Sequence, residues 1–581
     1  MKAILNNNYL ALGLIILISS ALFIPLIGNC PLFDWDEINF AECAREMVVT
    51  GNYSQVQLNY NPFWEKPPFF IWLQAISMNV FGINEFAARF PNAICSIVSL
   101  CLIYLIGKKV NSAKFGLVWV LVYAGTLLPH FYSKSGIIDP WFNLFIFGSF
   151  YQLLLHFNNP VGKEGLRTSV LAGFFLGMAV LTKGPAAIVI VGAFLGALWG
   201  FHRFKKVTNL KFLGIFVTSL LLTGFSWFIV EFLRGNSHVI KAFFEYQVRL
   251  FNTEDSDHGG FLLYHFVVLL IGCFPTSLLM ILAFKKSTHD TPFQKHIKLG
   301  MLILFFVVLG IFTLVKTKIV HYSSLCYLPM TYLATYAIFK LISGEYKIKP
   351  WFTMAFILIS MLLGMAFMAI GSINYLKPIL LNANVIKDVF AVENLKADVH
   401  WGGWEWIIGL AFIFVSHLLI RFISRGNFKL LYYLYGFYVV FILTTVNVLI
   451  PKVEQYTQSA AIEFYKAVAD KDFYVETSGF KSYAYLFYSK KRLEQNLNPE
   501  CIAEVKRNLD DMETRGHNRL TSYSLAYFNW LQYGKIDRPA VFVCKVTNAE
   551  QLLENHLIKK LYSKNGYVFC VRMPEKAFAR K

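Results

Sequence analysis

The segment YLALGLIILISSALFIPLIGNCPLFDWDEINFAECAREM (residues 9–47) joins two kinds of sequence whose contrast decides the fold. Residues 9–27 are apolar and long enough for a membrane helix, which needs about 20 mostly apolar residues. The residues that follow carry four carboxylates close together, on Asp34, Asp36, Glu37 and Glu42. Carboxylates are costly beside lipid, so the chain is expected to leave the membrane between these two parts.

The composition extends this membrane interpretation to the whole chain. Of the 581 residues, 56% are hydrophobic, 17% are aromatic and only 15% are charged, whereas a soluble domain has about 25% charged residues. The apolar segments that could form membrane helices lie near residues 9–28, 88–107, 115–132, 139–156, 169–183, 185–201, 211–232, 262–284, 299–315, 320–340, 351–373, 404–423 and 430–450. The sequence therefore predicts an α-helical polytopic membrane protein with about 13 transmembrane helices.

The basic residues predict how these helices are oriented. If the N-terminus is cytoplasmic, every loop on the inner side carries Lys or Arg, for example 108–114, 203–211 and 285–298. This agrees with the positive-inside rule, so the net charge of +19 reflects membrane orientation. No basic patch with interspersed aromatic residues is visible, so nucleic acid is not an expected partner.

The sequence also predicts two domains. Residues 1–450 form a transmembrane domain, and residues 451–581 form a polar α/β domain on the outer side. Within the tail, FYVETSG (473–479), AYLFYSKK (484–491), RPAVFVCKV (538–546) and GYVFCVRM (566–573) predict strands, and NAEQLLENHLIKKLYSKN (548–565) predicts a helix.

The first outer loop, residues 29–87, is expected to be ordered. DEINFAECAREMVV (36–49) has helical spacing of apolar residues, and Thr50-Gly51-Asn52 predicts the end of that helix. PPFFIWLQAISMNVFG (67–82) is apolar but too short to cross a bilayer, which favours an interfacial helix.

Several cations lie where the positive-inside rule disfavours them, at the outer ends of predicted helices. They are Lys66, Arg89, Lys134, Lys183, Lys316 and Lys318. Lys and Arg bind phosphate well, so the group predicts a pocket for an anionic ligand. For each one alone, the alternative is a side chain that extends to the lipid head groups.

Asp36 and Asp139 lie on the same outer side and are candidate catalytic acids. A general base must be a carboxylate or a histidine beside the acceptor. The alternative is that each acid begins a helix and complements its dipole, and this alternative also applies to Asp34. Glu65 and His258 are candidate metal ligands, although only two ligands are visible. No P-loop or GxGxxG motif is present, so no nucleotide cofactor is expected.

The motifs together carry a family resemblance. DWDEINFAECAREMVVTGNYSQVQLNYNPFWEKPPFFIWLQAISMNVFGINEFAARFPNA (34–93) resembles the amino-terminal signature of the polyprenyl-phosphate-dependent GT-C glycosyltransferases. SGIIDPWF (135–142), LTKGP (181–185) and KTKIVHYSSLCYLP (316–329) follow in the family's order. The pattern is similar to the protein O-mannosyltransferase superfamily and, within it, most similar to the lipid A aminoarabinose transferases.

The resemblance implies roles for individual residues. Asp36, with Glu37 beside it, matches the first-loop catalytic acid, and Asp139 matches the second functional aspartate. Lys66 matches the lysine that contacts the donor phosphate, and Lys183, Lys316 and Lys318 fall in motifs that line the same cavity. Glu65 and His258 resemble the positions that bind a divalent metal, either zinc or magnesium or manganese.

The resemblance also implies a reaction. A sugar, aminoarabinose or a related pentose or hexose, moves from undecaprenyl phosphate to lipid A or another glycolipid with inversion. The expected site is the periplasmic face of a bacterial inner membrane. The sequence leaves three alternatives: transfer to a protein Ser or Thr, transport of a polyprenyl-linked sugar, and a structural scaffold. A transporter predicts broken helices or repeated halves meeting at mid-membrane, and no repeat is visible in the sequence.

Overall fold

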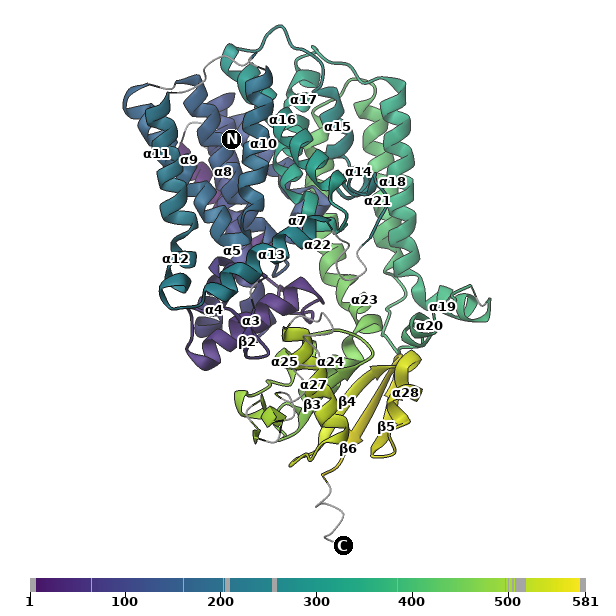
Figure 1. Cartoon of the computed structure of the whole chain (residues 1–581). Helices are drawn as coiled ribbons and strands as arrows, with labels where there is room; N and C mark the ends of the chain where they lie inside the picture. Colours follow the sequence, from purple (N-terminus) through teal and green to yellow (C-terminus); the bar gives the residue numbers. More distant parts are fainter. Residues whose placement is uncertain are drawn as a thin grey trace.

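The structure has two parts, a bundle of long helices and an α/β unit at one end of it (Figure 1). It is a computed structural model of the chain. It describes residues 7–63, 65–159, 161–201, 203, 209–252, 259–383, 385–496, 498–499, 501–503, 506 and 519–574.

Each apolar segment that the sequence predicts as a membrane helix is helical in the structure. The bundle consists of α2 (Asn8–Phe23), α5 (Glu85–Val110), α6 (Ala113–Ala124), α7 (Leu127–Tyr132), α8 (Asp139–Asn158), α9 (Gly162–Lys183), α10 (Ala186–Phe201), α11 (Leu210–Gly224), α12 (Ser226–Leu233), α14 (Tyr264–Gly272), α15 (Thr276–Leu282), α16 (Pro292–Leu314), η1 (Val320–Cys326), α17 (Tyr327–Ile342), α18 (Pro350–Gly371), α21 (Trp406–Ile423) and α22 (Leu430–Val448).

Length and hydropathy identify which of these helices can cross a membrane. Among the described residues, seven helices are long and apolar enough, and nine spans result if each of two bent helix pairs counts as one. Shorter apolar helices such as α2, α6 and α10 add to the bundle. The polytopic helical fold is therefore confirmed, and the number of about 13 spans stays a prediction.

Two of the predicted helices bend sharply, and the segment 115–132 divides into α6 and α7. The segment 211–232 bends by 51° between α11 and α12, and the segment 262–284 bends by 102° between α14 and α15. Pro275 immediately precedes α15. Proline lacks a backbone N–H and clashes with the preceding turn, so it favours a break at this point.

The first outer loop forms an ordered layer beneath the bundle. It contains α3 (Asp36–Thr50), the short strands β1 (Gln57–Leu58) and β2 (Asn61–Pro62), and α4 (Phe69–Phe81). The predicted end of α3 is confirmed, because Gly51 follows it with a φ of 69°, a left-handed conformation that glycine adopts at low cost. Asp34 does not cap α3, because no side chain caps this helix and residue 35 precedes it.

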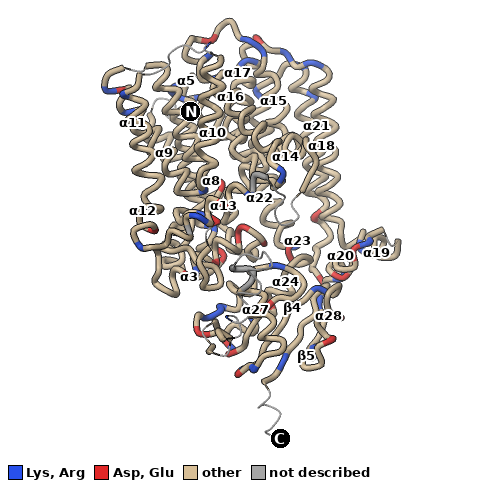
Figure 2. Tube along the Cα trace, in the orientation of Figure 1, with Lys and Arg blue, Asp and Glu red and all other residues tan. Residues whose placement is uncertain are grey.

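Further segments surround the same end of the bundle. These are α13 (Ser237–Asn252), α19 (Ile373–Asn382), α20 (Val389–Leu395) and α23 (Ile450–Thr457). Figure 2 shows many Lys and Arg positions along the opposite end of the bundle, away from the α/β unit. This distribution is the one that the positive-inside rule predicts for a cytoplasmic end.

The α/β unit contains a four-stranded sheet in the order β3-β4-β6-β5. Its strands are β3 (Tyr474–Ser478), β4 (Ala540–Lys545), β5 (Ile558–Lys564) and β6 (Tyr567–Arg572), and only the β3–β4 pair is parallel. The other elements are α24 (Ser459–Val468), α25 (Ala484–Tyr488), η2 (Leu493–Asn496), α27 (Arg519–Tyr533), η3 (Val546–Asn548) and α28 (Ala549–Leu553).

Two element predictions in this unit are wrong. The segment 484–491 forms helix α25 instead of a strand, because a short apolar run without clear periodicity also suits a buried helix. The segment 548–565 contains a short helix, α28, followed by strand β5, so the predicted single helix ends early.

Buried polar contacts join the first outer loop to the α/β unit. The Arg45 guanidinium donates to both carboxylate oxygens of Glu42 at 2.6 and 2.7 Å, and to the carbonyl of Lys491 at 3.1 Å. Tyr60 donates to the same carbonyl at 2.6 Å. The Glu42–Arg45 pair is thus almost fully buried at an interface instead of lying on a solvated face.

Candidate functional site

A cavity of about 650 Å³ lies between α3, α13 and the α/β unit. We call it the Asp36 cavity. Its charged lining residues are Asp36, Glu65, Lys66, Lys183, Glu245, Arg249, Glu476 and Lys481. It therefore brings together Asp36, Glu65, Lys66 and Lys183, four of the residues predicted from the sequence.

Asp36 begins α3, and its side chain is one-third exposed. Its Oδ2 lies 3.1 Å from Nε2 of His321, which belongs to η1. Burial alone would raise the pKa of Asp36, but the interaction with His321 and the charges of Lys66 and Lys183 outweigh it and hold this pKa well below its usual range. Asp36 is therefore an ionised carboxylate at neutral pH.

His321 and Asp139 do not line the cavity, but they extend this arrangement next to it. His321 Nε2 lies 3.6 Å from Asp139 Oδ2, and Lys183 Nζ donates to Asp139 Oδ1 at 2.6 Å. Asp139 is 3% exposed and begins α8, while Lys183 is the last residue of α9. Lys183 also lies 5.0 Å from the ring centroid of Tyr322. The two predicted acids are thus linked through a histidine.

Lys66 lies in the segment between β2 and α4 and is part of the cavity lining. Its Nζ lies 5.2 Å from the ring centroid of Tyr246 in α13, so the cation is positioned by an aromatic face. Among the lining carboxylates, burial raises the pKa of Glu476, which favours its neutral form. Four cations line the cavity in all, which suits it to an anionic ligand.

Two predicted site residues pair with each other away from the cavity. Arg89 donates to both oxygens of Glu37 at 2.7 and 2.8 Å, and also to the carbonyls of Ile27, Cys30 and Pro31. Both side chains are buried. The prediction that Glu37 acts in catalysis and Arg89 holds phosphate does not fit this position, since both hold the first loop against α5.

Lys316 and Lys318 also differ from their predicted roles. The Lys318 side chain is 6% exposed and donates to the carbonyls of Phe312, Thr313 and Val315 at 2.6 to 3.0 Å. These contacts supply hydrogen bonds to carbonyls at the end of α16, which lack partners within the helix. Lys316 is exposed and does not line the cavity.

Only one of the two predicted metal ligands lies within the described residues. Glu65 lines the Asp36 cavity, but His258 lies outside the described residues. Within those residues, no three His, Cys, Asp or Glu side chains are grouped to hold a metal ion. Metal binding by Glu65 and His258 therefore stays a prediction.

Sequence reasoning missed several residues of this site. His321 and Tyr322 lie inside the KTKIVHY motif, where only the lysines were selected. An ionisable residue at the outer end of an apolar helix is itself a functional signal, and it would have identified His321. Lys481 reaches the cavity from the α/β unit, a contact that sequence separation conceals.

The chain resembles known proteins over much of its length. Residues 65–227 match the family model described as dolichyl-phosphate-mannose-protein mannosyltransferase. An uncharacterized protein of Aquifex aeolicus is 30% identical over 356 residues, covering 61% of this chain and 77% of that protein. The crystal structure of ArnT from Cupriavidus metallidurans bound to undecaprenyl phosphate superposes with a TM-score of 0.72, at 15% identity, covering 96% and 97% of the two chains.

The chain belongs to the GT-C glycosyltransferases. Within them it is close to the lipid A aminoarabinose transferases. The undecaprenyl phosphate-α-4-amino-4-deoxy-L-arabinose arabinosyl transferase of Shewanella sediminis is 27% identical over 334 residues, which are 56% of this chain and 59% of that relative. The match thus spans about six-tenths of that curated relative's length.

Proposed function

We propose that this GT-C protein transfers a sugar, aminoarabinose or a related pentose or hexose, from undecaprenyl phosphate to lipid A or another glycolipid. The reaction takes place at the outer, periplasmic face of a bacterial inner membrane. The observation that carries the proposal is the Asp36 cavity, where an ionised carboxylate faces Lys66 and Lys183. The names of the arabinosyl transferase relatives support the sugar and the lipid carrier.

The cavity accounts for donor binding. The enzyme binds the donor through its phosphate, which is also the leaving group. Lys66 and Lys183 stabilise the negative charge that grows on this phosphate. Arg249 in α13 adds a third cation to the lining. The prenyl chain remains among the membrane helices, because its transfer into water would expose apolar surface.

The transfer exchanges one phosphate ester bond for another at the anomeric carbon. An acceptor oxygen forms a bond to this carbon on the face opposite the donor phosphate, and the bond from the carbon to the donor's phosphate oxygen breaks. The electron pair leaves with undecaprenyl phosphate, so the configuration inverts. An ionised Asp36 stabilises the positive charge that develops on the sugar ring.

The state of Asp36 favours a phosphate acceptor over a hydroxyl. A general base works best when its pKa lies near the working pH, whereas interactions with His321, Lys66 and Lys183 hold the pKa of Asp36 far below it. An acceptor phosphate is already ionised and needs no proton removed. Asp36 then orients the substrates and stabilises charge, and His321 positions Asp36.

Transfer to a protein Ser or Thr is the second candidate. It is supported by the family model, whose description names a protein mannosyltransferase. This reaction requires removal of a hydroxyl proton, so it demands a better base than the carboxylate of Asp36. Transporters often contain broken helices, so the two bent helix pairs support a polyprenyl-linked sugar transporter as a further alternative.

The test is mass spectrometry of lipid A and of surface glycoproteins from cells with and without the gene. We expect lipid A to lose a sugar substituent when the gene is deleted, and the wild-type gene to restore it. A change confined to glycoproteins would favour the protein acceptor. Unchanged lipid A and glycoproteins, with altered distribution of the lipid-linked sugar across the membrane, would favour the transporter.

A further inference from the structure

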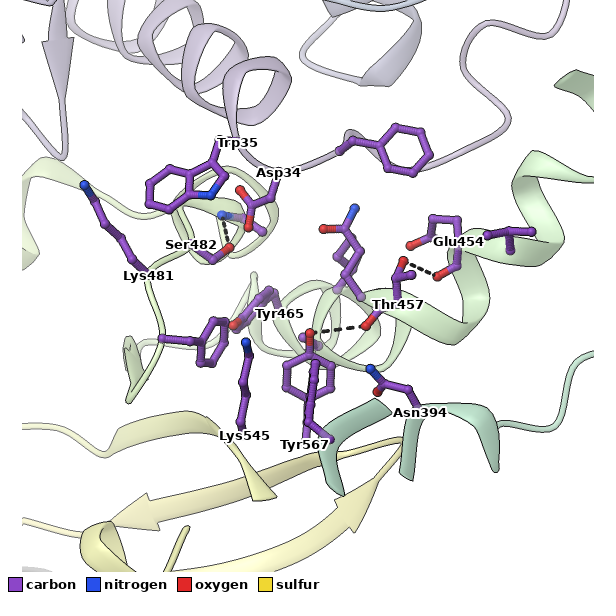
Figure 3. A pocket seen from close by; sticks show the side chains of 18 of the residues that line it. Asp34, Trp35, Asn394, Glu454, Thr457, Tyr465, Lys481, Ser482, Lys545 and Tyr567 are labelled. Carbon is purple, nitrogen blue, oxygen red and sulfur yellow. Dashed lines mark hydrogen bonds between the residues drawn. The ribbon is translucent and has the colours of Figure 1, made fainter. Parts of the chain in front are cut away.

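A second cavity, of about 920 Å³, lies between the end of the helical bundle and the α/β unit (Figure 3). We call it the Glu454 cavity. Phe131 of α7 and Glu454 of α23 line it from the bundle side, and Tyr465 of α24, Lys545 of β4 and Tyr567 of β6 line it from the α/β unit. It therefore opens where apolar helix ends meet a polar domain.

The two cavities are neighbours. Five residues line both of them: Trp35, Gly479, Phe480, Lys481 and Ser482. In the chain, Asp34 lines the Glu454 cavity and Asp36 lines the Asp36 cavity, on either side of Trp35. A molecule bound in the Glu454 cavity thus lies next to the place where the sugar is transferred.

Lys545 is a half-buried cation held by aromatic rings. Its Nζ lies 4.7 Å from the ring centroid of Phe390 and 5.6 Å from that of Phe480. Phe390 in turn packs edge-on against Tyr567 at 5.1 Å. Within the described residues, no carboxylate forms an ion pair with Lys545. A partly desolvated cation without a counterion suits an incoming anion.

Glu454 is a buried acceptor without a donor. It is 2% exposed, and its Oε1 accepts no hydrogen bond from any described residue. The nearby Thr457 hydroxyl donates to the Glu454 backbone carbonyl at 2.8 Å, so it does not serve the carboxylate. A buried oxygen without a partner is destabilising, and a ligand that brings hydroxyl or amino groups would supply the missing donor.

We propose that the Glu454 cavity binds the head group of an anionic glycolipid acceptor that carries two phosphates. One phosphate is held by Lys545 while the other reaches the Asp36 cavity and attacks the sugar. Hydroxyl groups of the acceptor's sugars donate to Glu454. Its acyl chains extend along the apolar residues Phe131, Ile450 and Val453 at the bundle end. This assignment rests on the proposed glycosyltransferase function.

The test uses the full-length protein in lipid nanodiscs, a labelled undecaprenyl-phosphate sugar, and lipid A as the acceptor. Diphosphoryl and monophosphoryl lipid A are compared. Lys545→Ala removes one charged contact, so we expect the KM for diphosphoryl lipid A to rise roughly 10- to 100-fold. The KM for the donor stays unchanged, and Lys545→Arg retains most of the acceptor affinity.

The monophosphoryl acceptor separates the proposed contact from a general effect. Its single phosphate is the one that attacks, so Lys545→Ala leaves its KM at the wild-type value. Glu454→Gln is expected to raise the KM of both acceptors, since the sugar hydroxyls are common to them. Lys560→Ala is the matched control, because Lys560 is an exposed lysine of β5 that lines neither cavity.

Three results would overturn the assignment: an unchanged acceptor KM in Lys545→Ala, an equal rise for both lipid A forms, or transfer only to a Ser/Thr peptide. Binding of undecaprenyl phosphate by the wild-type protein is measured separately. If the wild-type protein binds and transfers but Lys545→Ala is neutral, only the acceptor site is wrong. If the wild-type protein transfers no sugar to either acceptor class, the proposed function itself is wrong.

Discussion

His321 Nε2 lies 3.1 Å from Asp36 Oδ2 and thereby joins the first outer loop to the segment that follows α16. The same nitrogen lies 3.6 Å from Asp139 Oδ2. One imidazole thus sets the spacing of two carboxylates that come from different helices. The site depends on this contact, because no other described histidine forms an ion pair with Asp36.

The contact predicts a pH effect. The lowered pKa of Asp36 means that its carboxylate stays ionised above its usual pKa of 3.8 and loses this charge only as the pH falls further. In His321→Ala, burial still raises this pKa while the opposing interaction with the imidazole is lost, so the pKa of Asp36 rises. We expect the acid limb of kcat/KM to move to higher pH, measured between about pH 4 and 9. An identical acid limb in both proteins would contradict this role.

Substitutions of Lys66 and Lys318 should have different effects: the first on donor binding and the second on thermal stability. Lys66 lines the Asp36 cavity, so Lys66→Met is expected to weaken binding of undecaprenyl phosphate roughly 10- to 100-fold by removing a charged hydrogen bond. Within the described residues, the Lys318 ammonium donates to backbone carbonyls at the end of α16, so Lys318→Met should lower the Tm and leave the donor KM unchanged. The measurements are thermal unfolding and donor titration on both variants. The reverse pattern would show that their roles are exchanged.

The Glu37–Arg89 pair should be structural. Breaking a buried ion pair leaves one buried charge without its partner, at a cost of about 3–5 kcal/mol. Glu37→Gln and Arg89→Met are each expected to reduce the amount of folded protein in the membrane. The double variant should recover part of the loss, because it leaves no isolated charge. Additive losses in the double-mutant cycle would argue against the pairing.

The sequence was sufficient for the helical fold because the signal for a membrane helix is local. A long apolar run predicts its own helix, whatever the rest of the chain does. The breaks at α11–α12 and α14–α15 were not predicted. Pro275 is a local signal for the second break that the prediction did not use, whereas tertiary packing decides the bend between α11 and α12. The strand expected at 484–491 failed for a related reason: a short apolar run does not reveal its partners.

The candidate site was predicted in part for the same reason. Asp36, Lys66 and Lys183 could be selected because their charges stand out against an apolar background. Glu37 and Arg89 stand out equally, and only three-dimensional proximity shows that they neutralise each other. The sequence shows which charges are unusual, whereas the structure shows which of them face a cavity.

The central claim is that Asp36 performs the chemistry, and one measurement tests it most directly. Sugar transfer by Asp36→Asn is compared with transfer by Asp398→Asn, an exposed aspartate in the segment between α20 and α21. Protein amount and Tm are measured in the same membranes. We predict that Asp36→Asn accumulates normally and loses at least about 100-fold in transfer rate, while Asp398→Asn keeps the wild-type rate. Full activity in folded Asp36→Asn would contradict the account.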